Sequence, residues 1–319
     1  MSHLVENMFS VKETPWHKLG VVIKDAPSMD KVLELAGLNW SVSLRPLHLT
    51  MPDGTPKQVS ENAIVRDSDN SVLGFTGRRY RPLQNADALE FFRPFQESGL
   101  CSFETAGSLK SGQKIWIMAS LNNAEMEIVK GDVVRKYLLL SNGHDGKMGI
   151  RVGFTPVRVV CANTLAMAHN SGESKLIRVF HSSKTIENLE TLRETINAAN
   201  ATFEATAEQY RHLATRGVNA GDVARYVDLV FYNGKQAETD REKIARETLN
   251  ENINRLFEVG HGNDLANVRG TYWALYNGVT QYLSYEQGRS DDSRLDSLWY
   301  GANKDMNKTA LEQALVMAR

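Results

Sequence analysis

The sequence has little cysteine, little net charge and no long apolar run, and each shortage excludes a class of protein. Only Cys101 and Cys161 occur among the 319 residues, which excludes a disulfide framework and predicts two reduced thiols. No apolar stretch is long enough to cross a bilayer, and the first twenty residues lack a signal-peptide core. A net charge of −1 gives no overall basicity. We therefore expect a cytoplasmic globular protein, in which a polyanion could bind only to a local patch.

The motifs of common catalytic sites are also missing. The sequence has no phosphate loop of the GxxxxGK[ST] type, no GxGxxG, no GxSxG and no HExxH. The pair His144-Asp145 could act as a base with its orienting carboxylate, or bind a metal with His169 or His181. In a turn, such a pair is more commonly solvated. We expect no catalytic residue, no metal and no cofactor, and keep a metal-dependent hydrolase or nuclease as a third hypothesis.

Strand patterns dominate the first 180 residues. A three-stranded meander is predicted over Trp40–Met51, Gln58–Arg66 and Val72–Tyr80, because these partly alternating runs are joined by turn residues. Two helices are expected, at Ser28–Ala36 with Ser28 as cap and at Ala86–Glu97 with Asn85 as cap. Further strands are expected at 102–106, 114–121, 125–129, 133–140 and 175–181.

The stretch Lys136–Ala168 is the predicted centre of this region. Its apolar run reaches Leu140 and is followed by a turn with Asn-Gly and Asp-Gly. Met148–Phe154 then alternates as a half-buried strand does. Pro156 is expected to break that strand, Val157–Val160 to resume it, and Asn163 or Thr164 to cap a short helix through Ala168.

From about residue 183 the pattern becomes helical. Residues 184–216 contain no Gly or Pro, and apolar side chains recur every seven residues, which predicts a long helix with a seam for a partner helix. That partner lies either within the chain or on a second subunit. Further helices are expected at 218–233, 239–257, 268–285 and 307–318. The fold class is α+β, with a strand-rich core at 1–182 and a helical region at 183–319 that packs on the core or mediates oligomerisation.

Basic residues are concentrated in one part of the sequence. Residues 78–158 contain twelve Lys and Arg but eight Asp and Glu. Several of these basic residues lie at predicted strand ends, beside aromatic residues. Cations that follow phosphates and rings that stack on bases are what a single-stranded nucleic-acid groove requires. An ordinary solvated sheet face with ion pairs would give the same pattern. The candidate binding residues are Arg78, Arg79, Tyr80, Arg135, Lys136, Lys147, Arg151 and Arg158.

Three segments resemble a known family. The run Phe154–Leu165 resembles the central motif of the phage- and plasmid-like proteins grouped as domain of unknown function 932, Tyr80–Asn85 resembles a second landmark, and Gly270–Asn277 resembles the aromatic C-terminal one. The ordered resemblance extends from the Trp16 region almost to the C-terminus. It implies a protein of a mobile element and no particular activity.

A remoter similarity is to the single-strand annealing recombinases of the Red-beta, RecT and Erf kind. It implies a curved antiparallel sheet braced by a helix, and rings or filaments that hold single-stranded DNA. The leading hypothesis is therefore an oligomeric, ATP-independent protein that binds and anneals single-stranded DNA, with an exonuclease or single-strand-binding protein as a further partner. The alternative is an interaction or assembly factor for host takeover or anti-defence, which binds protein through its heptad and aromatic helices.

Overall fold

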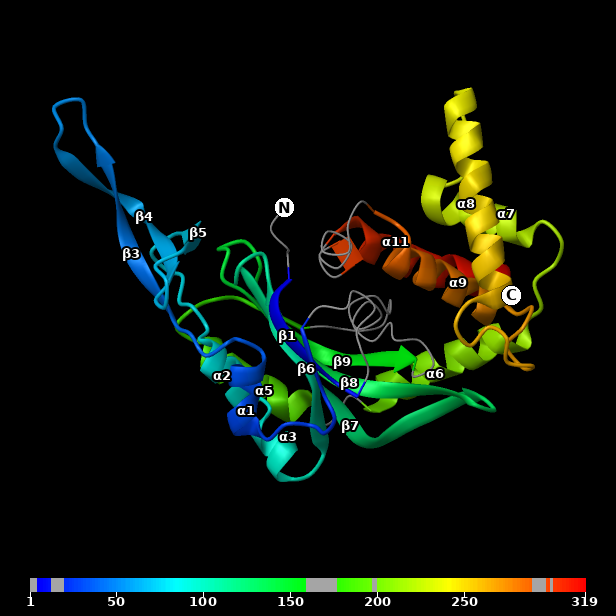
Figure 1. Ribbon diagram of the computed structural model, residues 1–319, viewed down its shortest axis with the longest axis horizontal. Coiled ribbons are helices and arrows are strands. Elements are labelled where there is room, and N and C mark those ends of the chain that lie inside the picture. Colours follow the sequence, from blue (N-terminus) through cyan, green and yellow to red (C-terminus); the bar gives the residue numbers. More distant parts are fainter. Residues whose placement is uncertain (1–4, 13–19, 159–176, 197–199, 289–296, 299–300) are drawn as a thin grey trace. The chain divides into compact units, whose positions relative to one another are not determined.

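The computed structural model describes the chain except for residues 1–4, 13–19, 159–176, 197–199, 289–296 and 299–300. It is an α+β protein, as expected (Figure 1). Trp16, Cys161, His169 and the expected helix ending at Ala168 lie outside the described residues. None of the described helices combines the length and apolarity needed to cross a membrane.

Two β-sheets contain the strands. A three-stranded antiparallel sheet has the order β3 (Val42–Thr50), β4 (Pro56–Arg66) and β5 (Val72–Thr76), which confirms the predicted meander. The strands of a seven-stranded sheet follow in the order β10 (Ile177–Val179), β9 (Ile150–Arg158), β8 (Asp132–Gly143), β7 (Lys114–Val129), β6 (Cys101–Leu109), β1 (Val5–Val11) and β2 (Val21–Ile23).

The chain divides into two compact units. The first consists of Met1–Asn122, Leu138–Gly153 and Leu176–Ala198, and the second of Asn123–Tyr137, Phe154–Lys175 and Ala199–Arg319. Strands β7, β8 and β9 thus contribute residues to both units. The boundary near residue 183 stays a sequence-based prediction.

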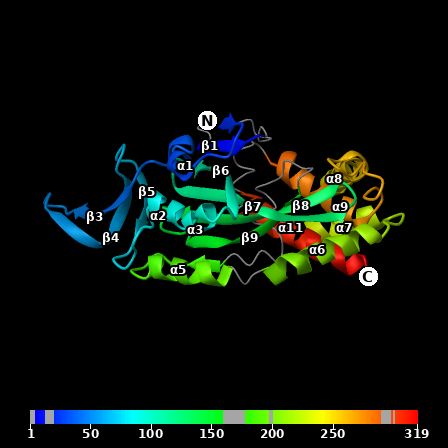
Figure 2. The ribbon, with the colours of Figure 1, turned by 90° about the horizontal axis from the view of Figure 1, so that it is seen from below.

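In the first unit, helices pack on strands β6 and β10 of the large sheet. Helices α1 (Met29–Leu35) and α3 (Arg93–Glu97) contact β6, α2 (Asn85–Glu90) contacts α1, and α5 (Thr185–Ile196) contacts β10. Figure 2 shows these four helices beside the strands of the sheet. Residues Ile115–Ala119 of β7 are fully buried, so this part of the strand is a continuous apolar run rather than an alternating one. Gly107 lies opposite Trp116, where an added Cβ would come within 2.7 Å of the indole.

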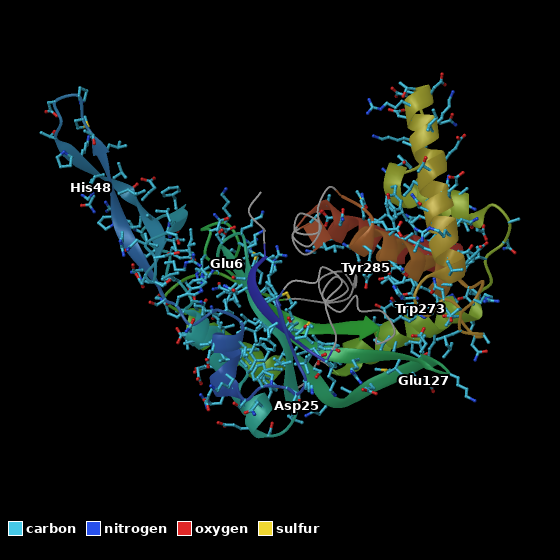
Figure 3. The ribbon with its side chains drawn as sticks, viewed as in Figure 1. Glu6, Asp25, His48, Glu127, Trp273 and Tyr285 are labelled. Carbon is cyan, nitrogen blue, oxygen red and sulfur yellow. The ribbon has the colours of Figure 1, made fainter. Side chains whose placement is uncertain are left out.

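A buried arginine joins β4 to β1 in the first unit. The Arg66 guanidinium donates to Glu6 Oε1 at 2.7 Å and to Asp69 Oδ2 at 2.6 Å, and it lies 5.3 Å from the centre of the Trp40 ring. Figure 3 shows Glu6 on β1 and, on the projecting β3–β4 hairpin, His48. The outer residues of this hairpin are exposed on both faces.

The second unit is built around one apolar helix. Helix α9 (Tyr272–Tyr285) is buried on nearly all sides, and Trp273 Nε1 donates to Asp132 Oδ2 at 2.7 Å. The Tyr210 ring packs on Trp273, with ring centres 4.6 Å apart. The heptad residue Tyr210 thus has an intramolecular partner. Around α9 lie α6 (Asn200–Thr215), α7 (Asp222–Tyr232), α8 (Asp240–Val259) and α11 (Ala302–Met317).

Two expectations about strands are wrong. Strand β9 continues through Pro156 to Arg158. Because β10 pairs with β9 only at residues 150–152, no described neighbour on that side needs the N–H that proline lacks. The break expected between the strands at 114–121 and 125–129 is also absent, and β7 is one strand. Asn122 is held in it by N–H bonds to the carbonyl oxygens of Leu100 and Gly99.

Two expectations about helices also need correction. The helix predicted at 86–97 is two short helices, because Pro94 lacks the N–H that a continuous helix would use. The helix predicted from Val218 begins at Asp222, since Gly221 has a φ of +90°. The stretch predicted as one helix over 184–216 contains α5 and α6, and residues 197–199 lie outside the described residues.

Candidate nucleic-acid interface

The loop that follows β5 contains three arginines, Arg78, Arg79 and Arg81. Arg81 donates from Nη1 to the carbonyl oxygens of Arg78 and Tyr80, at 3.0 and 2.9 Å. Arg81 therefore holds the loop in shape. Arg78 and Arg79 are exposed, so their guanidinium groups are available to a ligand in solution.

Tyr80 anchors this loop to the rest of the unit. Its hydroxyl donates to the Gly143 carbonyl at 3.2 Å, and its ring packs on the His181 ring with centres 4.6 Å apart. Burial, helped by the Asp145 charge, raises the pKa of the Tyr80 phenol. The side chain is half-buried, so its main role in this conformation is to fix the loop.

His144 lies beneath the loop in a fully buried position. Its Nε2 is 3.0 Å from Asn85 Oδ1, and the Trp40 ring packs edge-on against it. Burial, and secondarily the neighbouring His181, lowers the pKa of His144 to about 3. Burial also lowers the pKa of His181. Both rings are therefore neutral at pH 7 and act as packed structural groups.

Lys147 belongs to the turn that begins at Asp145. This turn contacts strand β5, which leads into the loop with Arg78, Arg79 and Arg81. Asp145 Oδ1 accepts the N–H groups of Lys147 and Met148, both at 2.8 Å. A Cβ on Gly146 would lie 2.1 Å from the Phe75 carbonyl oxygen, and one on Gly74 would lie 2.4 Å from the Asp145 backbone. Strand β5 and this turn are thus in direct backbone contact. No cluster of three potential metal ligands occurs among the described residues.

Strands β9 and β10 add two more arginines. Arg151 and Arg178 are opposed in the antiparallel register, so they share a face of the sheet. Arg178 is exposed, whereas Arg151 is half-buried and its Nη1 atom is shielded from solvent. The Arg178 guanidinium lies 4.9 Å from the centre of the Phe180 ring. That ring is 67% exposed, and it offers an open aromatic surface next to the cations.

These contacts bring three short segments of the first unit together. Residues 77–84, 145–151 and 177–184 meet around the Tyr80–His181 ring pair, and they contain a single acid, Asp145. We call the region formed by these three segments the basic surface. Its Lys and Arg residues are Arg78, Arg79, Arg81, Lys147, Arg151, Arg178 and Lys184.

Two of the predicted binding residues, Arg135 and Lys136, are not part of this surface. Arg135 is paired with Glu125 at 2.5 Å, and Lys136 is 1% exposed, with its ammonium 4.0 Å from the centre of the Phe154 ring. Both residues belong to the second unit. The side chain of Arg158 lies outside the described residues. Arg135 and Lys136 therefore serve internal contacts in this conformation.

Sequence reasoning missed Arg178, Phe180 and Lys184. A strand was predicted at 175–181, so the signal for Arg178 was present as a basic residue within it. What the sequence does not give is the register that sets Arg178 opposite Arg151. Arg81 was noted within the basic stretch but not chosen as a binding residue.

Comparison with known proteins identifies the family. The model described as "Domain of unknown function (DUF932)" matches residues 72–299, which are 228 of the 319 residues. The chain therefore belongs to this family, as the resemblance indicated. The Trp16 region lies outside the matched residues. No curated protein and no solved structure matches the chain.

Proposed function

We propose that this DUF932 chain binds single-stranded DNA through the basic surface of its first unit and promotes annealing without a nucleotide cofactor. The supporting observation is that three separate segments, which contain seven cations and one acid, meet around the Tyr80–His181 ring pair. Such a surface fits a polyanion, and phosphate contacts supply most of the affinity in nucleic-acid binding.

The exposed ring favours a single strand. The bases of a single strand can stack on Phe180, and Arg178 beside that ring can contact both a phosphate and a base. Stacking of this kind tolerates any sequence, which suits annealing. The proposal places the protein in the cytoplasm of a host cell as part of a phage or plasmid system. It forms a ring or filament there, and an exonuclease or single-strand-binding protein is a further partner.

The two rival hypotheses have less support from the structure. The assembly-factor hypothesis requires the heptad and aromatic helices to bind another protein. Tyr210 of the heptad helix, however, packs against Trp273 and Tyr276 of the aromatic helix. The hydrolase was to use His144, which is fully buried. These three rings and the His144 ring are therefore not open to a partner or substrate in this conformation.

The first test combines size, binding and annealing. Size-exclusion chromatography with light scattering, with and without a labelled single-stranded oligonucleotide, is run at low and physiological salt. We expect a large oligomer that takes up the strand and accelerates pairing of complementary oligonucleotides without ATP. A monomer or dimer that is indifferent to the strand would refute the proposal.

A further inference from the structure

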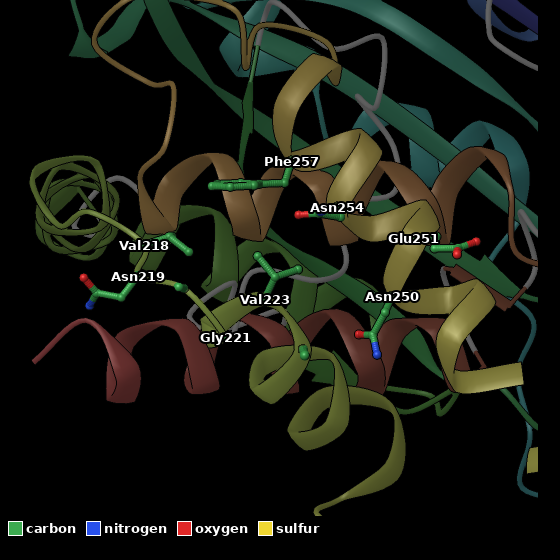
Figure 4. Close-up of a pocket in the computed structure, with 10 residues that line it drawn as sticks. Val218, Asn219, Gly221, Val223, Asn250, Glu251, Asn254 and Phe257 are labelled. Carbon is green, nitrogen blue, oxygen red and sulfur yellow. The ribbon is translucent and has the colours of Figure 1, made fainter. Parts of the chain in front are cut away.

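The second unit contains a pocket of about 480 Å³ between helices α7 and α8 (Figure 4). Val218, Val223 and Phe257 form its apolar part. Glu251 is the only charged residue of the ten that line it, and Figure 4 shows its carboxylate directed away from Phe257. The pocket therefore presents no charged group that would select a ligand, whereas the first unit has a more specific surface.

That surface is one face of the three-stranded sheet. The inner face of this sheet contributes Ile64 to a buried apolar cluster. An antiparallel sheet with one covered face usually presents polar side chains to solvent on the other. Here the other face, which we call the outer face, is apolar as well, and Leu49, Val72 and Phe75 are 58%, 53% and 60% exposed. A contiguous group of exposed apolar side chains is typical of a surface that binds a partner.

The strand register places these exposed side chains on the outer face. Phe75 on β5, Ala63 on β4 and Arg45 on β3 are opposed in one row, and opposed residues share a face of the sheet. Val72 is opposite Val65 in a second row. Because Val65 is two residues from Ala63 on β4, the second row shares the face of the first. The two rows form the base of the outer face.

The outer face continues along the projecting β3–β4 hairpin (Figure 1). Leu47 and Leu49 follow Arg45 at intervals of two residues on β3, so they point to the same side. The register shift beyond Pro46 leaves this alternation intact, because the extra residues are in β4. Lys57 is opposite Leu49 and adds a cation near the tip. The outer face thus consists of Arg45, Leu47, Leu49, Lys57, Ala63, Val65, Val72 and Phe75.

A partner is better suited to this face than to the edge of the sheet. Strand β3 lies at one edge, and it contains Pro46. Proline has no N–H to donate, and its presence in an edge strand hinders pairing with a further strand. We therefore expect a partner to pack on the outer face through side chains.

A base and an acid lie at opposite ends of the outer face. Lys57, near the tip, is exposed. At the other end, the hydroxyls of Ser43 and Ser41 donate to the Asp67 carboxylate at 2.6 and 2.7 Å and lower its pKa. Ser43 is two residues before Arg45 on β3, so this carboxylate lies at the outer face. Arg45 Nη2 is 3.9 Å from Asp67 Oδ1, too far for a hydrogen bond, so the carboxylate can accept another cation.

We infer that two copies of this chain pack outer face on outer face about a two-fold axis, with their hairpins antiparallel. The axis lies between the two sheets and across their strands, so the tip of each hairpin covers the base of the other. Lys57 of one copy then pairs with Asp67 of the other, and the symmetry repeats the pair. A parallel arrangement would bring the two Lys57 side chains together, which like-charge repulsion disfavours. A second copy is the favoured occupant because one face supplies both charges.

The size of the outer face predicts weak pairing. Strand β3 has 9 residues and β4 has 11. At about 3.4 Å per residue and about 4.8 Å between strands, the outer face covers about 400 Å². A stable dimer buries about 800 Å² on each partner, so we expect a Kd of about 10–100 µM. The contact uses no residue of the basic surface and does not depend on the proposed DNA binding.

The test is sedimentation velocity of the full chain without DNA, at concentrations that span the expected Kd. Lys57→Glu and Asp67→Lys should each weaken pairing about tenfold, because each replaces two attractive contacts by two repulsive ones. An equimolar mixture of the two variants should pair about as tightly as wild type, since unlike charges then face each other at both contacts. Mixing would not restore a contact made within one chain.

Two further variants test whether the outer face makes the contact. Leu49→Asp places a charge in it and should abolish pairing, whereas Thr50→Asp, on the opposite face of the same hairpin, leaves pairing unchanged. Both positions are exposed, and thermal unfolding checks that each variant is folded. Charge reversals on the basic surface should weaken DNA binding but not pairing, which separates this inference from the proposed function.

Three results would each overturn the assignment. They are a monomer at every concentration, equal pairing by wild type and Leu49→Asp, and a mixture that pairs no better than either charge variant alone. The first of them would leave the outer face to a different partner.

Discussion

At the scale of single residues, the loops that carry the cations depend on buried groups that carry no charge. His144 and His181 are neutral because the protein excludes water from their rings, which lowers the pKa of both. A histidine whose folded pKa lies below its unfolded value binds fewer protons when folded, so its contribution to stability is complete above about pH 6.5 and is lost as the pH falls.

The first prediction concerns this pH dependence. Between about pH 8 and about pH 5.5, we expect His144 alone to remove about 1.4 kcal/mol from the free energy of unfolding. In His144→Gln that part of the decrease disappears, although the variant is less stable at neutral pH. Denaturant unfolding of both proteins at the two pH values measures the difference. Equal decreases in the two proteins would contradict the buried, neutral state of His144.

The second prediction separates backbone conformation from close packing at two glycines. Gly146 and Gly54 have φ values of +72° and +83°. A Cβ at Gly146 meets the Phe75 carbonyl, whereas a Cβ at Gly54 meets nothing within 4 Å. We expect Gly54→Ala to cost about 1 kcal/mol from conformation alone and Gly146→Ala about 3 kcal/mol or more. Equal losses in denaturant unfolding would mean that β5 and the Lys147 turn are not in contact.

At the scale of elements, the start of α8 was predicted from local side chains, whereas the cap predicted at Asn85 is wrong, because Gln84 is the cap and Asn85 is the first residue of α2. The capping box of Thr239 and Glu242 begins α8 next to the predicted residue, because the signal lies within four positions. The break at Phe91-Phe92 and the continuation of β9 through Pro156 were missed. The break at Phe91-Phe92 depends on the position of Pro94 within a helical turn. The continuation of β9 through Pro156 depends on which strands pair with β9 on its two sides.

The third prediction tests this helix start. Thr239→Ala removes the side chain that accepts the Glu242 N–H, and we expect it to cost about 1 kcal/mol. Thr248→Ala, an exposed change inside the same helix, is the control. It should be neutral or slightly stabilising, since alanine has the higher helix propensity. A Thr239→Ala variant as stable as the control would mean that the cap does not stabilise α8.

At the scale of the whole molecule, the sequence predicted the α+β class and about half of the basic surface. The residues Arg78, Arg79, Lys147 and Arg151 were found because basic residues are dense in that stretch of sequence. Arg178 and Lys184 were not, because they join the surface only through the pairing of β10 with β9 and the Tyr80–His181 contact. Arg135 and Lys136 were included because composition does not show which cations are paired or buried within the chain.

The fourth prediction is the salt dependence of single-stranded DNA binding by wild type and by a triple charge reversal, Arg78→Glu, Arg79→Glu and Arg178→Glu. If about five cations contact phosphates, the logarithm of the binding constant falls with the logarithm of salt with a slope of about −3.5. The triple variant should bind much more weakly, with a slope less steep by about 2. Arg241→Glu, an exposed reversal at the start of α8, is the matched control.

The most direct test of the account is therefore fluorescence anisotropy of a labelled single strand, titrated with these three proteins from about 50 to about 200 mM salt. The account predicts a steep slope for wild type and the Arg241→Glu control, and a shallow slope with weak binding for the triple variant. If the folded triple variant binds with the affinity and slope of wild type, the basic surface is not where DNA binds, and the central claim is wrong.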